Sequence, residues 1–280
     1  MNVVLVCLNN FQPYILTNIK QLLSLQHSNI FVITNSYLFS RFDEYKTQIT
    51  LIEADLLHDS FEFEQKTTLN KHFKNGFWWL TSLRFFYIYE FMKRYNMTNI
   101  VHLENDVLIY HNCNSLINLV DSNFLYMPFD TYKRNIASIM YIPNKEVFKT
   151  ILDNYDFNKN DMDNFSSIKQ TTGLIKQFPI FIANQQMTDE EKFVCENSAS
   201  FPYIFDAAAI GQYVGGVDPN NIPGNTVGFV NETCVIKYNN YKIWFEMNDY
   251  GNKKPFIMIN DKPIPIFNLH IHSKGLENFI

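Results

Sequence analysis

Residues 99–110 read Asn-Ile-Val-His-Leu-Glu-Asn-Asp-Val-Leu-Ile-Tyr, which sets two carboxylates between two apolar runs. The run Asn99–Leu103 predicts a strand that ends at the acidic residues. In an extended backbone Glu104 and Asp106 would share one face, so both carboxylates could converge on one cation. Hard oxygen ligands suit Mg²⁺ or Mn²⁺, and the motif therefore predicts a divalent metal site. The alternative is a pair of carboxylates solvated in a loop.

The chain before this motif alternates strands with helices, the pattern of a mostly parallel sheet. The pattern predicts strands at Val3–Leu8, Asn29–Thr34 and Ile49–Glu53, a helix after Pro13, and an aromatic-rich helix from Phe77 to about Tyr95. In such an order the carboxyl ends of the strands meet at one edge, where open sheets bind ligands. The predicted fold class is α/β, a single Rossmann-like domain whose mostly parallel central sheet is flanked by helices.

The second half of the chain is less regular and predicts a small antiparallel part near the C-terminus. The predicted elements are a strand Ser138–Ile142, a helix Lys145–Tyr155, a helix capped by Asp161 and running to about Lys169, a short helix Asp206–Val214, a hairpin of Val235–Tyr238 with Lys242–Phe245 around Asn239-Asn240, and a last strand Phe267–His272. No repeat, low-complexity segment or linker interrupts the sequence, which predicts one domain over residues 1–280.

Composition excludes several classes of protein. Hydrophobic residues make up 46% of the 280 residues and the net charge is −5, which favours a packed core and excludes a general affinity for nucleic acid. The four cysteines are far apart, so they predict free thiols and neither a Cys-x-x-Cys zinc site nor a redox pair. Without a transmembrane segment or a signal peptide pattern, we expect a cytoplasmic protein.

A second motif lies near the C-terminus, where residues 267–274 read Phe-Asn-Leu-His-Ile-His-Ser-Lys. In a strand, His270 and His272 would share a face opposite Leu269 and Ile271. Imidazole is a common ligand of divalent transition metals, so the pair predicts metal ligands, and which of the two binds is open. The alternative is a half-buried histidine pair in an edge strand.

The acidic motif resembles the Asp-x-Asp motif of the A-type glycosyltransferase fold. The similarity extends upstream through residues 78–86, because in glycogenin-like transferases a helix that carries an arginine runs toward the donor and leads into the acidic motif. The resemblance implies that Asp106 binds the metal, Glu104 the ribose or the metal, and Arg84 the donor. Glutamate stands where the family has its first aspartate, which moves that carboxylate further from the backbone.

The resemblance also covers the C-terminal motif and the donor site. A-type transferases often take a last metal ligand from a histidine near the C-terminus, and some follow it with a lysine on the diphosphate, the role implied for Lys274. The related fold seats the nucleoside after the first strand, so Asn9 and Asn10 are expected to contact the donor, together with Asn105 of the acidic motif. Ordinary turn chemistry is the alternative for Asn9 and Asn10.

Two aspartates are candidate catalytic residues. Asp206 opens the small-residue segment 206–216 and resembles the acid that leads a helix in inverting A-type transferases, where it is the general base for the acceptor hydroxyl. Asp161 lies where related transferases keep a donor- or acceptor-binding acid. For both residues the alternative is a helix cap that accepts backbone N–H bonds. Asn231-Glu232 is a third candidate.

The predicted function is metal-dependent sugar transfer, hexosyl or pentosyl, from a nucleoside-diphosphate sugar to a glycan or other hydroxyl acceptor. Mn²⁺ or Mg²⁺ is the expected cofactor and a UDP-sugar the favoured donor, bound mainly by residues 1–110, while residues 111–280 bind the acceptor and complete the metal site. The alternatives are a nucleotidyltransferase that uses the same acid-x-acid site and a non-catalytic carbohydrate-binding protein. Whether transfer retains or inverts the anomeric configuration is open.

Overall fold

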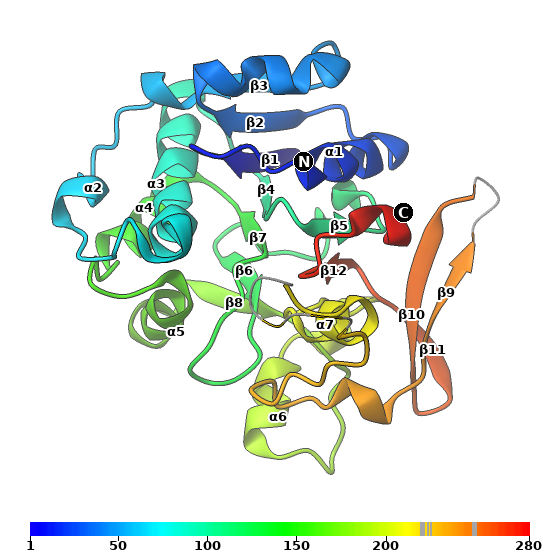
Figure 1. Cartoon of the computed structure of the whole chain (residues 1–280). Helices are drawn as coiled ribbons and strands as arrows, with labels where there is room; N and C mark the ends of the chain where they lie inside the picture. Colours follow the sequence, from blue (N-terminus) through cyan, green and yellow to red (C-terminus); the bar gives the residue numbers. More distant parts are fainter. Residues whose placement is uncertain (219–221, 223, 225, 248–250) are drawn as a thin grey trace.

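The computed structural model describes residues 1–218, 222, 224, 226–247 and 251–280. The helices are α1 (Tyr14–Ser24), α2 (Phe63–Lys66), α3 (Phe77–Tyr95), α4 (Lys145–Asp153), α5 (Asp161–Thr172), α6 (Asp189–Val194) and α7 (Ala209–Gly215). The strands are β1 (Asn2–Cys7), β2 (Ile30–Thr34), β3 (Thr50–Glu53), β4 (Ile100–Leu103), β5 (Val107–Ile109), β6 (Leu125–Pro128), β7 (Ile139–Ile142), β8 (Ile175–Phe178), β9 (Ile243–Met247), β10 (Lys253–Ile259), β11 (Lys262–Pro265) and β12 (Asn268–His270). Short 3-10 helices connect several of the helices and strands, and Figure 1 shows how the labelled elements are arranged.

A seven-stranded sheet in the order β3-β2-β1-β4-β7-β6-β8 forms the centre of the described structure (Figure 1). Strands β1 to β4 pair in parallel, β7 is antiparallel to both β4 and β6, and β8 is parallel to β6. Near the C-terminus β9, β10 and β11 form a small antiparallel sheet. The predicted fold class, a mostly parallel central sheet with a small antiparallel part, is therefore confirmed.

Helices cover both faces of the central sheet because successive side chains of a strand point to opposite faces. In β1, Val4 packs into a core with residues of α3, α4 and α5, whereas Val3 and Leu5 pack into a second core with α1. All three side chains are fully buried. The continuous apolar run of this strand is thus explained by burial on both faces.

Helix α3 is 19 residues long and matches the predicted bounds. It follows Gly76, whose φ of 81° lies in the left-handed region, and it ends at Asn96 in the same conformation. Its buried aromatic side chains, Phe85, Phe86 and Phe91, pack into the first core and fix the helix against the sheet. This packing sets the position of Arg84, which lies on the same helix.

Four predictions about the second half need correction. The expected hairpin around Asn239-Asn240 is wrong: residues Tyr238–Asn240 form a 3-10 helix, and β9 pairs instead with β10. The last strand ends at His270, two residues earlier than expected. Helix α7 begins at Ala209, three residues after Asp206. The N-cap of α5 is Asn160, whose side chain accepts the Asp163 N–H, so Asp161 is not the cap.

The strand β12 connects the C-terminal part to the acidic motif. It pairs antiparallel with β5, with His270 opposite Val107, and the Ile271 N–H donates to the Asp106 carbonyl at 2.9 Å. Helix α7 packs against β12 at Gly211, where any Cβ would overlap the carbonyl group of His270. None of the described helices combines the length and the apolar character that crossing a bilayer requires.

Candidate active site

A cavity of about 800 Å³ lies at the edge of the sheet where β1 and β4 end. Its lining comes from five parts of the chain: the end of β1 with the start of α1, the segment before α3 with its first turns, β4 with the acidic motif, Asp218 after α7, and the C-terminal segment from His270 onward. This is the edge at which open α/β sheets bind ligands, as the sequence predicts. Candidate residues on this cavity are Asn10, Arg84, Glu104, Asn105, Asp106, His270, His272 and Lys274.

The acidic motif forms a turn, so the expectation of an extended backbone is wrong. Strand β4 ends at Leu103, the Val107 N–H donates to the Glu104 carbonyl at 3.1 Å, and β5 then begins. Asn105 anchors this turn, because its side-chain nitrogen donates to the Val6 carbonyl at 2.8 Å and to Gln12 Oε1 at 2.5 Å. The turn still brings both carboxylates together, although strand alternation is not the reason.

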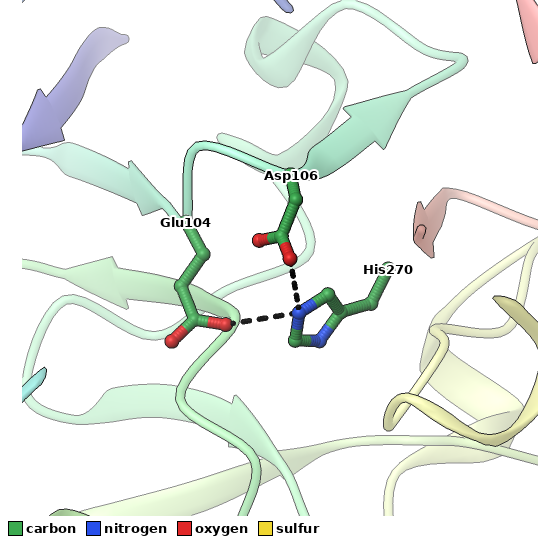
Figure 2. Close-up of side chains that lie close together, drawn as sticks. All are labelled: Glu104, Asp106 and His270. Atoms are coloured by element: carbon green, nitrogen blue, oxygen red, sulfur yellow. Dashed lines mark ion pairs between the residues drawn. The ribbon is translucent and has the colours of Figure 1, made fainter. Parts of the chain in front are cut away.

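The two carboxylates meet the first C-terminal histidine. Figure 2 shows His270 Nε2 between them, 3.2 Å from Asp106 Oδ2 and 3.3 Å from Glu104 Oε2. Lys274 adds an ion pair with Asp106 Oδ2. Segments far apart in sequence therefore converge on one point, as expected, and the register of β12 against β5 is what aligns them.

The charges of this group shift its pKa values. Burial alone would raise the pKa of Asp106, but Lys274 and then His270 hold that pKa well below its usual range. Burial opposes the charged form of His270, yet the Asp106 carboxylate outweighs it and raises the pKa of the imidazole. Burial likewise disfavours the charged form of Lys274, and Asp106 again raises the pKa. Asp106 is thus an anion whose contacts are the Lys274 ammonium and the His270 imidazole.

These residues fit a divalent cation. One oxygen each of Glu104 and Asp106 and one ring nitrogen of His270 lie within 4.8 Å of one another, which makes them a possible ligand set among the described residues. Two carboxylates and an imidazole are donors that Mn²⁺ accepts, and the carboxylates also suit Mg²⁺. His272 lies next to this group, with its ring centroid 4.2 Å from that of His270. Its Nδ1 is hydrogen-bonded to Gln212, 3.1 Å away.

Arg84 lies between two acids beside the cavity. Its guanidinium forms an ion pair with Glu104, and Nη2 lies 3.2 Å from Asp161 Oδ2. Arg84 and Asp161 are both buried, so the guanidinium holds Glu104 toward the cavity and ties it to α5. Burial raises the pKa of Asp161 to about 6, although the charge of Arg84 acts in the opposite direction. Asp161 is absent from the described lining of the cavity.

Asp206 lies outside the cavity lining of the described residues and has no exposed surface. Its two carboxylate oxygens accept three backbone N–H groups, those of Ile210 and Gly211 at 2.8 Å and that of His270 at 2.9 Å. Burial raises the pKa of Asp206. This geometry favours the capping interpretation over that of a general base, because a base must reach the acceptor hydroxyl.

The asparagines after β1 differ from each other. Asn10 lines the cavity, whereas Asn9 is absent from its described lining. Asn9 has a φ of 62°, its N–H donates to Asn35 Oδ1, and its carbonyl accepts the Tyr37 hydroxyl. These contacts match the turn chemistry that the sequence left open for Asn9.

Several lining residues were not predicted. Gln12 and Tyr14 lie where α1 starts, His102 lies on β4, and Lys71 precedes α3. The rule that ligands bind where a strand passes into its helix would have indicated Gln12 and Tyr14. His102 carries no such sign in the sequence, because it reads as one member of an apolar strand.

Comparison with known proteins finds similar solved structures at low sequence identity. No protein-family model matches the sequence, and neither does any curated protein. The solved structures that are similar include mouse xyloside xylosyltransferase 1, with 10% identity over 64% of this chain and 84% of that chain, at a TM-score of 0.44. They also include the glycosyltransferase GlyE of Streptococcus pneumoniae, with 16% identity over 63% of this chain and a TM-score of 0.41.

The aligned region is 44% of the GlyE chain, less than half of its length. A cytidylyltransferase from Leptospira borgpetersenii matches as well, with 8% identity over 68% of this chain and 78% of that chain, at a TM-score of 0.38. Glycosyltransferases and a cytidylyltransferase are thus among the structures to which this chain is similar. The TM-scores of these matches lie below 0.5, so the reaction must be argued from the site residues.

Proposed function

We propose that this protein is a metal-dependent glycosyltransferase that moves a sugar from a nucleoside-diphosphate sugar to a hydroxyl acceptor. One observation carries the proposal: Glu104, Asp106, His270 and Lys274, from two distant segments, meet at the ligand-binding edge of the sheet. Their side chains pair with one another and also line the cavity, so a bound ligand can replace some of these pairs. A cavity of about 800 Å³ beside it is large enough for a nucleotide sugar.

Each residue has a definite task in this proposal. Asp106, Glu104 and His270 would hold Mn²⁺ or Mg²⁺, and the cation would offset negative charge on the leaving diphosphate. Lys274 would leave Asp106 and pair with phosphate oxygens instead, because an ammonium group serves as a point charge for phosphate. Arg84 would hold Glu104 in place through their ion pair and carry positive charge at the cavity wall.

The donor and the acceptor belong to the proposal as well. Asn10 and Asn105 line the cavity near the end of β1, where their amides would contact the nucleoside of a UDP-sugar. A glycan or another hydroxyl compound would bind on the side of the C-terminal segment. Since Asp206 is enclosed by backbone N–H groups, a retaining reaction, which needs no base at that position, fits this site better than an inverting one.

The test is a binding and turnover panel on the whole chain. Thermal unfolding is measured with UDP, other nucleoside diphosphates, nucleotide sugars and free sugars, each with Mn²⁺ and with a chelator. We expect stabilisation by a nucleoside diphosphate only when Mn²⁺ is present, and slow release of that diphosphate from one sugar donor. The anomeric configuration of the released sugar, read by NMR, distinguishes retention from inversion.

A matched pair of variants locates the site. Asp106→Asn should lower the Mn²⁺-dependent affinity for the nucleotide by about 100-fold or more, since loss of a metal ligand costs at least as much as loss of a residue that supports one. Asp153→Asn, in an exposed ion pair with Lys149, should leave that affinity unchanged. Equal affinity in both variants would reject the site.

Two other results would replace the proposal. Release of pyrophosphate from a nucleoside triphosphate and a sugar phosphate would show a nucleotidyltransferase that uses the same acids. Stabilisation by a free sugar without nucleotide or metal would show a carbohydrate-binding protein.

A further inference from the structure

The two C-terminal histidines of the cavity have different surroundings. His270 has its Nε2 against the carboxylates of Glu104 and Asp106. His272 instead lies at the end of a chain of side-chain hydrogen bonds that begins at Asn231 and passes through Gln212. Its Nε2 is buried and has no hydrogen-bond partner among the described residues, and the side chain lines the cavity. This chain of bonds fixes which ring nitrogen of His272 carries the proton.

The orientation of the Asn231 amide is set by the backbone. Its Oδ1 accepts the Thr233 N–H at 3.0 Å and the Cys234 N–H at 3.3 Å. An amide turned the other way would direct its NH₂ group at two N–H donors, which cannot bond to each other. The Asn231 Nδ2 is therefore the group that faces Gln212.

The orientation of Gln212 follows from that of Asn231. The Asn231 Nδ2 donates to Gln212 Oε1 at 3.0 Å, so the oxygen of this second amide faces Asn231. Its Nε2 then faces His272 Nδ1 at 3.1 Å. An NH₂ group only donates, so His272 Nδ1 must be the acceptor and cannot carry a proton. A neutral imidazole in this setting carries its proton on Nε2.

We propose that His272 is not a metal ligand but a hydrogen-bond donor, whose Nε2–H binds a phosphate oxygen of the nucleoside diphosphate. A nitrogen that carries a proton has no lone pair to give to a metal, whereas it can donate to an anionic oxygen. Lys274 lines the same cavity two residues further along the chain, so both donors serve one oxygen-rich group. Gln212 and Asn231 are positioning residues that set the tautomer. The ligand assignment rests on the function proposed above.

The tautomer can be read without any ligand. In protein labelled with ¹⁵N at histidine, long-range proton–nitrogen NMR distinguishes a protonated from an unprotonated ring nitrogen, and His272→Gln assigns the resonances. We expect His272 to carry its proton on Nε2 in the free protein at neutral pH. A proton on Nδ1 would overturn the proposal.

A remote isosteric variant should reverse the tautomer. In Asn231→Asp the carboxylate accepts the same backbone N–H groups and must also accept from Gln212, so the Gln212 amide turns and presents its oxygen to His272. The proton of His272 should then move to Nδ1, and the affinity for UDP with Mn²⁺ should fall about ten-fold or more, the value of a hydrogen bond to a charged group. An unchanged tautomer would overturn the chain of bonds.

Asn184→Asp is the matched control, because its Oδ1 also accepts a backbone N–H two residues on, at Gln186, and its side chain is exposed. This variant should keep both the tautomer and the affinity for UDP. A loss equal to that of Asn231→Asp would mean that added negative charge, and not the tautomer, weakens binding, which would overturn the role of Asn231.

Variants of the two histidines distinguish a hydrogen-bond donor from a metal ligand. Titration with Mn²⁺ without nucleotide, followed by electron paramagnetic resonance, should show a large loss of affinity in His270→Ala and less than a two-fold change in His272→Ala. The latter variant should instead lose about ten-fold in affinity for UDP at saturating Mn²⁺, and His272→Gln, which keeps an N–H donor, should recover part of it. Equal losses of Mn²⁺ affinity in the two alanine variants would overturn the proposal.

The same measurements separate this inference from the function on which it rests. If the wild-type chain binds no nucleotide with Mn²⁺, the proposed function and the ligand of His272 both fail, while the tautomer still confirms or rejects the chain of bonds. If the loss in His272→Ala appears only with a nucleotide sugar and not with UDP, the donor binds a sugar hydroxyl, and the phosphate assignment is wrong.

Discussion

Asp106 and Asp206 are two buried aspartates that both contact His270, and yet their surroundings have little in common. Asp106 faces the His270 side chain and the Lys274 ammonium at the wall of a cavity. Asp206 accepts the His270 backbone N–H together with two N–H groups from the start of α7. The first carboxylate is held by side chains, and the second by the backbone.

This difference separates a binding group from a structural one. Side chains such as Lys274 can rotate away, so Asp106 can exchange its partners for a ligand without a change of fold. The backbone donors around Asp206 cannot leave unless α7 or β12 moves, and Gly211 leaves no space between these two elements. The identity of a carboxylate's partners is thus a better guide to its role than burial, which the two residues share.

The prediction with the largest expected effect tests whether Asp206 has a structural role. Asp206→Ala should lower the free energy of unfolding by at least about 3 kcal/mol, because three buried backbone donors lose their acceptor at about 1 to 3 kcal/mol each. Chemical denaturation monitored by circular dichroism measures this. Asp153→Ala, at an exposed position, should change stability by less than about 0.5 kcal/mol. Full stability of Asp206→Ala combined with lost turnover would make Asp206 a catalytic base after all.

A second test extends the comparison to histidines. The buried His27 accepts the Cys113 N–H at Nε2, 3.2 Å away, and burial, helped by the N-terminal ammonium, lowers its pKa from 6.5 to about 4. Between these values the unfolded chain binds a proton that the folded chain does not. Stability should therefore fall on acidification from pH 6.5 to about 4, by up to about 1.4 kcal/mol per pH unit from this residue.

The measurement is urea unfolding at a series of pH values. His27→Gln retains an acceptor for the Cys113 N–H. In this variant the free energy of unfolding should depend less steeply on pH than in the wild type, because up to one proton fewer is taken up on unfolding. His58→Gln, at an exposed position, serves as the control and should keep the wild-type slope. A His27→Gln slope equal to that of the wild type would show that this histidine takes up its proton in the folded state.

The smallest expected effect concerns the exchangeable partner of Asp106. Lys274→Met keeps most of the apolar stem and should change the stability of the metal-free protein by less than about 1 kcal/mol, since the ammonium is partly exposed. Affinity for Mn²⁺ alone should rise several-fold because a competing cation is gone, while affinity for UDP at saturating Mn²⁺ should fall. If both affinities are unchanged, Lys274 does not share a ligand with the metal, and the proposed exchange is wrong.

The sequence predicts the first half of the fold well because its elements depend on local patterns. Continuous apolar runs place β1, β2 and β3 within about one or two residues, and the aromatic helix has the expected bounds. The predicted hairpin is wrong although Asn239-Asn240 is a good turn pair, because the segment before it, Val235–Tyr238, forms no strand and the segment after it pairs elsewhere. Strand β9 pairs with β10, which begins at Lys253, and no local pattern indicates that choice.

The sequence predicts those residues of the candidate site that belong to the two short motifs. Glu104, Asp106, His270 and Lys274 were all proposed from two segments, and the structure brings them together. What the sequence could not show is their geometry: the acids lie in a turn, and β12 ends before His272, so strand alternation does not set the direction of either pair. The surroundings of Asp206 depend on the backbone of α7 and β12 and leave no pattern in the sequence.

The pairing of β12 with β5, and the ion pair beside it between Lys274 and Asp106, join parts of the chain that lie up to 168 positions apart. A cation held by Asp106 and His270 would act as a removable crosslink across that long loop, and mass action would favour the closed chain as the cation concentration rises. Proteolysis of the intervening chain should therefore be slower with Mn²⁺ than with a chelator, even when no nucleotide is present.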